Sequence, residues 1–422
     1  MYVTEVVWSM ESNLLFTAAL GLQAPWQVAS IRFEPDQGQI HFDLTCASSR
    51  LNCPVCDAAD QPIHDRKSRR WQHLHFFQYQ AFLHAPVPRV KCQQCGKVTQ
   101  VPVPWARPGS GFTLLMDALV LALAQQLPVA QIARLFGVTE NRLWRAIGVH
   151  VEGARATTSY ADVVALGVDE KHVGRTLGYV TLFHDPLNPR VIGVVEGRKA
   201  ETFATFKQDF VSHDGQPDAI DCIAMDLAPG YQAGARQHFP QADICFDAFH
   251  LAKLVHDALD TVRRAEVKQD ASLKGARWGL LKSPEDWTRQ QITDMHWLQR
   301  SGLKTARAWR MKQRFREIHQ LCRLGADPEP LYRAWISWAR RSRLEPFKRL
   351  GRTLKQHLPG ILAAYRRGIS NAVAENLNSQ IQAAIVRARG FKSFRSLAHI
   401  IFLTTGKLEN LPANPLARPV TG

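Results

Sequence analysis

The chain has 422 residues, of which 45% are hydrophobic and 21% are charged, so it is a folded protein with room for two or three domains rather than a disordered one. Its formal net charge is +16, which favours an anionic partner, and a nucleic acid is the first candidate. The longest apolar run, FTLLMDALVLALAQQL, is interrupted by Asp117 and is too short and too polar to span a bilayer. No secretory signal is recognisable at the start, so we expect an intracellular protein.

Residues 1–45 predict a short helix over 10–22 and then a β-hairpin. Two runs with strand-like alternation, WQVASIRFE and QIHFDLTC, flank the turn sequence PDQG.

Residues 46–107 contain two Cys-x-x-Cys pairs, Cys53/Cys56 and Cys92/Cys95, on either side of two strand-like runs. Such a pattern predicts a zinc ribbon that binds one structural Zn²⁺, because two knuckles supply the four thiolates of a tetrahedral site. Free thiols or a redox pair are the alternative. Four histidines lie between the pairs and are expected on strands rather than as ligands: His64, His73, His75 and His84. This segment is basic, and we expect Arg69 and Arg70 to contact DNA.

A proline-rich connector leads to residues 108–158, which predict a helix-turn-helix with its turn at Gly137–Val138. The hydrophobic residues expected in its core are Ile132, Leu135, Val138, Leu143 and Ile147. The second helix starts at Thr139, and a recognition helix reads DNA with polar side chains at its start, here Thr139, Asn141, Arg142 and Arg145. An ordinary helix pair in a protein core is the alternative interpretation.

Residues 159–255 predict an α/β domain with a mixed sheet. The strand-like runs are DVVALGVD, YVTLFHD, RVIGVVE, AIDCIAMD and ADICFD, with helices near 200–210, around YQAGARQHF and from His250. Two of the buried strands end in an acid, Asp169 and Asp226, which should then lie side by side at one edge of the sheet. Aspartate is also common in turns and at helix N-caps, so a structural role is the alternative.

Residues 256–365 have no strand pattern and predict a basic, helical domain that contains six of the eleven tryptophans. We expect most of these tryptophans in its core, with Arg and Lys on the outer face toward phosphates.

A further helix is predicted within residues 366–405, and the last residues, 406–422, form a tail. Ser370 is a candidate N-cap, and the helix should bury a stripe formed by Val373, Leu377, Ile381 and Ala384. Asn371, Glu375 and Asn378 fall on another face, which could be a solvated face or the third side of a cation site.

The three acids Asp169, Asp226 and Glu375 could together bind two Mg²⁺ or Mn²⁺ ions, because these ions prefer hard oxygen ligands. Two such ions would support phosphoryl transfer on DNA by activating the attacking oxygen and stabilising the leaving one. In this interpretation Asn371 and Asn378 orient Glu375 or contact the DNA backbone.

The chain resembles the DDE transposases of bacterial insertion sequences, specifically the ISL3 family. The resemblance rests on the paired Cys-x-x-Cys segment, the helix-turn-helix and four motifs in order: ALGVDEKH, AMDLAPGY, CFDAFHLAKL and SNAVAENLNSQIQAAIVRARGFKSFRSL. It covers the chain from about residue 45 to residue 405.

The resemblance implies an RNase H-like core, formed by 159–255 and 366–405 and interrupted by a helical insertion domain at 256–365. Its catalytic triad would be Asp169, Asp226 and Glu375. The motif Asp247-x-x-His250 implies that His250 positions the scissile phosphate with support from Asp247, and a packing role is the alternative.

The implied reaction is hydrolysis at terminal inverted repeats, followed by attack of the freed 3′-hydroxyls on target DNA. A homodimer or higher oligomer would pair the two ends, in the bacterial cytoplasm at the nucleoid. Two other functions use the same elements: a domesticated, catalytically idle DNA-binding regulator, which has no need of three acids, and a structure-specific nuclease, which has no need of a sequence-reading head.

Overall fold

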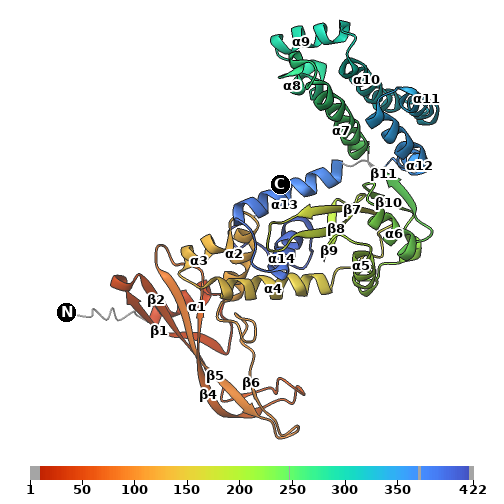
Figure 1. Cartoon of the computed structure of the whole chain (residues 1–422). Helices are drawn as coiled ribbons and strands as arrows, with labels where there is room; N and C mark the ends of the chain where they lie inside the picture. Colours follow the sequence, from red (N-terminus) through yellow and green to blue (C-terminus); the bar gives the residue numbers. More distant parts are fainter. Residues whose placement is uncertain (1–9, 247, 369–371, 418–422) are drawn as a thin grey trace. The chain divides into compact units, whose positions relative to one another are not determined.

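The computed structural model describes residues 10–246, 248–368 and 372–417 (Figure 1). Three residues with predicted roles, Asp247, Ser370 and Asn371, lie outside these ranges. The described residues form two compact units. The first unit runs to Thr158 and also contains Ala384–Thr404 and the residues from Leu408 onward, and the second contains Ser159–Ala383 and Thr405–Lys407. No helix in the described ranges is both long enough and apolar enough to cross a membrane.

The first unit begins with the predicted helix and hairpin, namely α1 (Met10–Ala19), β1 (Trp26–Glu34) and β2 (Gln39–Cys46), with a short 3₁₀ turn at Pro35–Gln37. The remaining strands are β3 (Arg50–Leu51), β4 (Gln61–Gln72), β5 (Gln80–Lys91) and β6 (Val98–Gln100). Strand β2 pairs in parallel with β5, so the hairpin and the strands between the cysteine pairs share one six-stranded sheet. The sequence pattern gave no sign of this pairing, because the two strands are far apart in the chain.

The proline-rich connector is fixed on this sheet by Trp105. Its indole packs edge-on against Trp26 and Trp71, with ring centroids 4.8 Å and 5.5 Å apart. Arg107, two residues later, donates from Nε to the fully buried Asp117 carboxylate at 2.7 Å. This ion pair explains why an acid interrupts the apolar run around residue 117, since a buried carboxylate needs a charged partner.

Helices α2 (Leu114–Ala124), α3 (Val129–Phe136) and α4 (Glu140–Ala156) follow the connector. The predicted turn is present, because Gly137 ends α3 with a φ of 62° in the left-handed region that glycine tolerates best. Ile132, Leu143 and Ile147 are fully buried as predicted. Leu135 is 54% exposed, so its assignment to the core was wrong. The residue after it, Phe136, is buried instead, because it is the one that lies four positions after Ile132 on the same helix face.

Helix α14 (Phe394–Thr405) packs on α4 within the first unit. Glu152 of α4 accepts hydrogen bonds from Arg395 at 2.6 Å and from His399 at 2.9 Å. Gly148 leaves room for the His399 ring, which a Cβ at that position would approach to 3.0 Å.

The second unit contains a five-stranded sheet of β7 (Ala165–His172), β8 (Tyr179–Asp185), β9 (Arg190–Glu196), β10 (Cys222–Met225) and β11 (Asp243–Phe246). The strand order is β11-β10-β7-β8-β9. The strands β7, β8 and β9 form an antiparallel meander, whereas β10 and β11 run parallel to β7. Helix α5 (Glu201–Ser212), a 3₁₀ turn at Pro217–Ala219 and helix α6 (Pro229–His238) connect the later strands, which confirms the predicted mixed sheet.

One strand boundary differs from the prediction. Strand β7 does not end at Asp169 but continues to His172, which pairs with Tyr179 of β8. The polar run after Asp169 hides this extension in the sequence, while the antiparallel partner β8 satisfies its backbone hydrogen bonds.

From residue 248 to residue 367 the described chain is helical, as predicted. The helices are α7 (Ala248–Glu266), α8 (Arg277–Leu281), α9 (Arg289–Arg300), α10 (Lys304–Arg323), α11 (Pro328–Arg341) and α12 (Glu345–Arg367), with 3₁₀ turns at Ala271–Leu273 and Pro284–Asp286. Three of the six tryptophans are exposed by 40% or more, namely Trp278, Trp297 and Trp338, so the expectation that most are core residues was wrong.

Helix α12 packs directly against β11 of the sheet. A Cβ at Gly360 would lie 2.6 Å from the Phe246 ring and 2.7 Å from the Ile244 carbonyl oxygen, so only glycine fits at this crossing. Helix α13 (Ala372–Ala388) follows. Its predicted stripe is buried at Leu377, Ile381 and Ala384.

Candidate functional site

The four cysteines of the two Cys-x-x-Cys pairs converge in the first unit. One pair precedes β4 and the other follows β5, and because these strands are antiparallel both pairs lie at the same end of the β4–β5 ribbon. The Sγ atoms of Cys53, Cys56, Cys92 and Cys95 all lie within 4.8 Å of one another. Two of the cross-knuckle distances are 3.8 Å, between Cys53 and Cys95, and 3.5 Å, between Cys56 and Cys92. A tetrahedral zinc ion with Zn–S bonds of about 2.3 Å requires sulfur atoms about 3.8 Å apart, so this group of thiols fits Zn²⁺.

The two cysteine knuckles have the same local geometry. In each, the residue after the second cysteine adopts a left-handed conformation, Asp57 with φ 53° and Gly96 with φ 69°. Backbone N–H groups point at the sulfurs, since Val55 donates to Cys53 Sγ at 3.5 Å and Cys95 donates to Cys92 Sγ at 3.4 Å. The backbone hydrogen bond from Cys95, with a further one from Gln94, lowers the pKa of Cys92 to about 6, which favours the thiolate that a metal ion requires.

The histidines near the knuckles do not join the group of thiols, in agreement with the prediction. His64 and His84 lie on β4 and β5 as expected, but His73 and His75 follow the end of β4 and are not strand residues. His73 is held by Thr113, whose Oγ1 lies 2.9 Å from its Nδ1, and burial lowers its pKa to about 4.

In the second unit, the pairing of β7 with β10 sets Asp169 beside Asp226. The two strands are parallel with Ala224 opposite Gly167, and two residues further along each chain come Asp226 and Asp169. Asp226 directly follows the last residue of β10 and is fixed by a hydrogen bond from the Ala228 N–H to its Oδ1 at 2.9 Å. Burial is the main cause that raises the pKa of Asp169, and the negative charge of the neighbouring Asp226 adds to this rise.

A hollow of about 300 Å³ lies at Asp169, and Glu375 is part of its wall. Helix α13 contributes one face, because residues spaced by three or four positions lie on the same side of a helix. The hollow is lined by Asp169, Lys171, His250, Glu375, Asn378, Ser379 and Gln382. The structure thus brings Asp169, Glu375 and His250 to one hollow. The third acid of the predicted triad, Asp226, directly follows the neighbouring strand β10.

Hydrogen bonds fix the Asp169 carboxylate. Its Oδ1 accepts from the Glu170 N–H at 2.7 Å, and its Oδ2 accepts from Asn378 Nδ2. Burial raises the pKa of Asp169, and these two hydrogen bonds oppose that rise. The other amide atom, Asn378 Oδ1, is buried and makes no hydrogen bond to any described residue. This hard oxygen beside a carboxylate is the kind of donor that Mg²⁺ accepts.

Among the described residues, the four cysteines form a group of metal-ligand atoms that all lie within 4.8 Å of one another, and Asp169, Asp226 and Glu375 do not form such a group. Glu375 is exposed on α13.

Lys171 is the residue that the sequence analysis missed. It lies on the wall of the hollow, two positions after Asp169 on β7, and alternation along a strand places both side chains on one face. Burial lowers the pKa of Lys171, while the Asp169 charge opposes that shift. Recognising that β7 extends to His172 would have found it.

The predicted DNA-contacting residues of the first unit differ in how far their side chains are exposed to solvent. Asn141 and Arg145 are exposed at the start of α4, together with Thr139. Arg142 is half-buried, with its guanidinium 4.3 Å from the Phe112 ring centroid and a 3.1 Å hydrogen bond to the Gly111 carbonyl.

Arg69 and Arg70 border a groove of about 710 Å³ between β4 and the proline-rich connector, within the first unit. Arg70 stacks over Phe82 at 3.8 Å, and Arg69 donates to Gln100.

Comparisons with known proteins agree with this arrangement along the chain. A transposase family model of the ISL3 DDE type matches residues 166–401, more than half of the chain. The helix-turn-helix domain of transposase family ISL3 matches residues 101–147, and the zinc-finger of transposase IS204/IS1001/IS1096/IS1165 matches residues 50–95.

Two curated relatives extend over nearly the full length. The chain is 28% identical over 444 residues to the transposase for insertion sequence element IS1557 of Mycobacterium tuberculosis (strain H37Rv), with 96% of this chain and 98% of the relative covered. It is 25% identical over 387 residues to the transposase for insertion sequence element IS1001 of Bordetella parapertussis, with 87% of this chain and 93% of the relative covered.

Proposed function

Because the chain belongs to the ISL3 family of insertion-sequence transposases, we propose that it cleaves DNA at terminal inverted repeats and joins the freed 3′-hydroxyls to target DNA. The observation that carries this proposal is the convergence of three acids from distant positions. Asp169 and Asp226 are neighbours on β7 and after β10, and Glu375 shares the hollow of Asp169.

We propose further that the second unit is an RNase H-like core with a helical insertion at 256–365. The sheet supports this proposal, because an antiparallel three-stranded meander is extended on the side of its first strand by two parallel strands. The two acids lie on the first strand and directly after the fourth, which places them at the centre of the sheet.

In this mechanism Asp169, Asp226 and Glu375 hold two Mg²⁺ or Mn²⁺ ions. Such ions supply an activated water or hydroxyl and stabilise the leaving 3′ oxygen. Asn378 orients Asp169 through its hydrogen bond, and its Oδ1 is available to a cation or to substrate. Lys171 and His250 face the same hollow, where their donors can hold the non-bridging oxygens of the scissile phosphate.

Two predicted supporting residues, Asn371 and Asp247, remain part of the proposal although the structure does not describe them. Asn371 is four residues before Glu375 in the sequence, and Asp247 is the residue after Phe246.

The first unit, in this proposal, recognises the transposon ends. Its helix-turn-helix would place Thr139, Asn141 and Arg145 in the major groove, with Arg142 supporting the docking helix. The ribbon, held by one Zn²⁺, would contact the backbone through Arg69 and Arg70. Two or more copies of the chain would hold the two ends together, in the bacterial cytoplasm at the nucleoid.

The test is to incubate the purified full chain with Mg²⁺ and DNA that carries the sequences flanking its own gene, and then to map cuts and joined products. We expect cleavage at both repeats and strand-transfer products in target DNA. Cuts without any joined product would favour a nuclease. Specific binding without cleavage in Mg²⁺ or Mn²⁺ would favour an idle regulator.

A further inference from the structure

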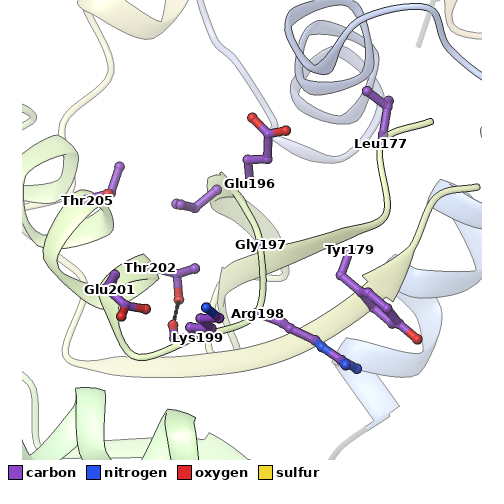
Figure 2. A pocket seen from close by; sticks show the side chains of 10 residues that line it. Leu177, Tyr179, Glu196, Gly197, Arg198, Lys199, Glu201, Thr202 and Thr205 are labelled. Carbon is purple, nitrogen blue, oxygen red and sulfur yellow. Dashed lines mark hydrogen bonds between the residues drawn. The ribbon is translucent and has the colours of Figure 1, made fainter. Parts of the chain in front are cut away.

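A second hollow, of about 410 Å³, lies where β9 turns into α5, and no predicted site residue lines it (Figure 2). We propose that Arg198 and Lys199, at this corner, hold a backbone phosphate of a DNA strand a few nucleotides from the scissile phosphate. The proposal rests on the proposed function, because it places this contact on the DNA that enters the acidic site.

The hollow is at the same end of the sheet as the acids. Tyr179, in its wall, begins β8 opposite His172, the last residue of β7. Glu196, also in its wall, ends β9 opposite Val180. Neighbouring strands are about 4.8 Å apart, so β9 is about 10 Å from β7. Asp169 is opposite Leu182, and Leu182 is opposite Val194, so Arg198 is also four residues farther along the chain than the position level with Asp169. At a rise of about 3.4 Å per nucleotide, the gap between the corner and Asp169 corresponds to several nucleotides.

The corner packs against helix α6, which begins at Pro229, three residues after Asp226. A Cβ at Gly234 of α6 would lie 3.0 Å from the Ala200 carbonyl oxygen and 2.5 Å from the Phe203 ring, so α6 and the start of α5 are in close contact. The Lys199 carbonyl accepts two hydrogen bonds from Thr202, from Oγ1 at 2.7 Å and from N at 3.1 Å. The position of this corner relative to Asp226 is therefore fixed by packing.

The Arg198 side chain is oriented without using its hydrogen-bond donors. Its guanidinium carbon lies 4.1 Å from the centroid of the Tyr179 ring. This cation–π contact uses the face of the guanidinium and leaves its N–H groups available to a ligand. Within the described residues, no carboxylate lies within 4 Å of Arg198 or Lys199, although Glu196 and Glu201 line the same hollow. In Figure 2 the Glu196 side chain points away from Arg198.

These two unpaired cations match the chemistry of a phosphodiester. A planar guanidinium binds two phosphate oxygens at once, and an adjacent ammonium adds a point charge. The two carboxylates in the hollow limit the cationic area to the corner itself, so we expect one strand to be held rather than both. A backbone contact of this type positions the strand and carries no sequence information.

The test measures how affinity depends on salt for the full chain, wild type and the double variant Arg198→Ala/Lys199→Ala. Two duplexes are compared without added Mg²⁺, one with the terminal repeat and one of unrelated target sequence. Each lost phosphate contact should flatten the plot of log K against log salt by about 0.9. We expect the double variant to lose a slope of about 1–2 and about 10-fold in affinity on at least one of the two duplexes. A loss on the repeat alone assigns the held strand to the transposon end, a loss on the other duplex alone assigns it to the target, and a loss on both means that the corner holds either DNA.

Two further variants keep the test specific. Arg236→Ala removes one exposed positive charge from the last turn of α6, at the far end of that helix from Asp226, and should leave the slope unchanged. Arg198→Lys keeps the charge and should restore most of the slope. Unchanged slopes for the double variant on both duplexes would overturn the proposal. Failure of the wild type to cleave, with the slope difference intact, would count against the proposed function alone.

Discussion

The two candidate metal sites of this chain are assembled in different ways. The thiols come from two knuckles at the base of one β-ribbon and are already within bonding distance of a shared ion. The acids come from a strand, a strand end and a helix, at positions as far apart as 169 and 375, and do not form such a compact group. The thiols are fixed by backbone hydrogen bonds, whereas Glu375 is exposed on its helix.

This difference matches what each site is expected to do. A structural zinc site is closed by four protein ligands, so its geometry can be complete before the ion binds. A site for phosphoryl transfer must leave positions for water and for the DNA oxygens, so its protein ligands cannot enclose the ions. If this difference is correct, substitutions at the thiols should affect zinc binding and folding, and substitutions at the acids should affect cleavage.

The largest effect is expected for the acids. Asp169→Asn, Asp226→Asn and Glu375→Gln should each lower the cleavage rate by about 1,000-fold or more, because each removes a charged ligand from the ions. Binding to the repeat should stay nearly unchanged, since the DNA-reading elements belong to the other unit. Gel assays of cleavage and of binding measure both properties. Asp218→Asn, at an exposed aspartate, is the matched control, and near-normal cleavage by any of the three variants would remove that residue from the triad.

For the thiol site, Cys92→Ser should abolish stoichiometric zinc and weaken binding to the repeat by about 100-fold, because metal binding and folding of the ribbon are coupled. Metal analysis of the purified protein and a binding titration measure these effects. Cys322→Ser, at a half-buried cysteine of α10, should retain both zinc and binding. Full zinc content in the Cys92 variant would contradict the four-thiolate assignment.

The stability of the second unit at acidic pH should depend on His184. Burial lowers the pKa of this β8 histidine to about 4, whereas the unfolded chain has a value near 6.5. Between these values the unfolded state binds a proton that the folded state does not, so stability is lost as the pH falls from about 6.5 to about 4. At pH 5 the loss is about 2 kcal/mol relative to pH 7.

Urea unfolding of His184→Leu at pH 7 and at pH 5 checks this prediction. The variant should show a smaller difference between the two pH values, whatever its absolute stability. His296→Leu, at an exposed histidine of α9, should behave like the wild type. An unchanged pH dependence in the His184 variant would mean that other groups cause the acid sensitivity.

The smallest effect is expected for Asn378→Ala, which removes the hydrogen bond to Asp169 but no charge. We expect cleavage to fall by about 10-fold, because a ligand that is less well oriented still binds the ion. A higher Mg²⁺ concentration should recover part of the rate, which distinguishes a positioning role from a purely structural one. Asn376→Ala, at an exposed asparagine of the same helix, is the control, and equal losses in both variants would refute the assignment.

The sequence was sufficient where local patterns determine the structure. The two cysteine knuckles, the turn at Gly137 and the buried strands before Asp169 and Asp226 are short segments with a strong chemical signature, and all are present. The order of these motifs also identified the family correctly.

The sequence was insufficient where contacts between residues far apart in the chain determine the structure. The extension of β7 through Lys171 depends on its partner β8, and the joint sheet of hairpin and ribbon depends on the parallel pairing of β2 with β5. The exposed Trp278 shows a further limit, since tryptophan content does not reveal which face of a helix lacks a partner. The spacing of the acids, likewise, follows from side-chain positions that no periodicity encodes.

The pairing of β4 with β5 has a consequence for changes in chain length. Trp71 lies opposite Leu83 near one end of this ribbon, and Ile63 lies opposite Val90 near the knuckles. One residue added to either strand between these points would shift the two knuckles against each other by about 3.4 Å and turn the following side chains to the opposite face. Insertions, tags or labels are therefore best placed at the turn around Phe77, which is 80% exposed, because added length there leaves the thiols in register.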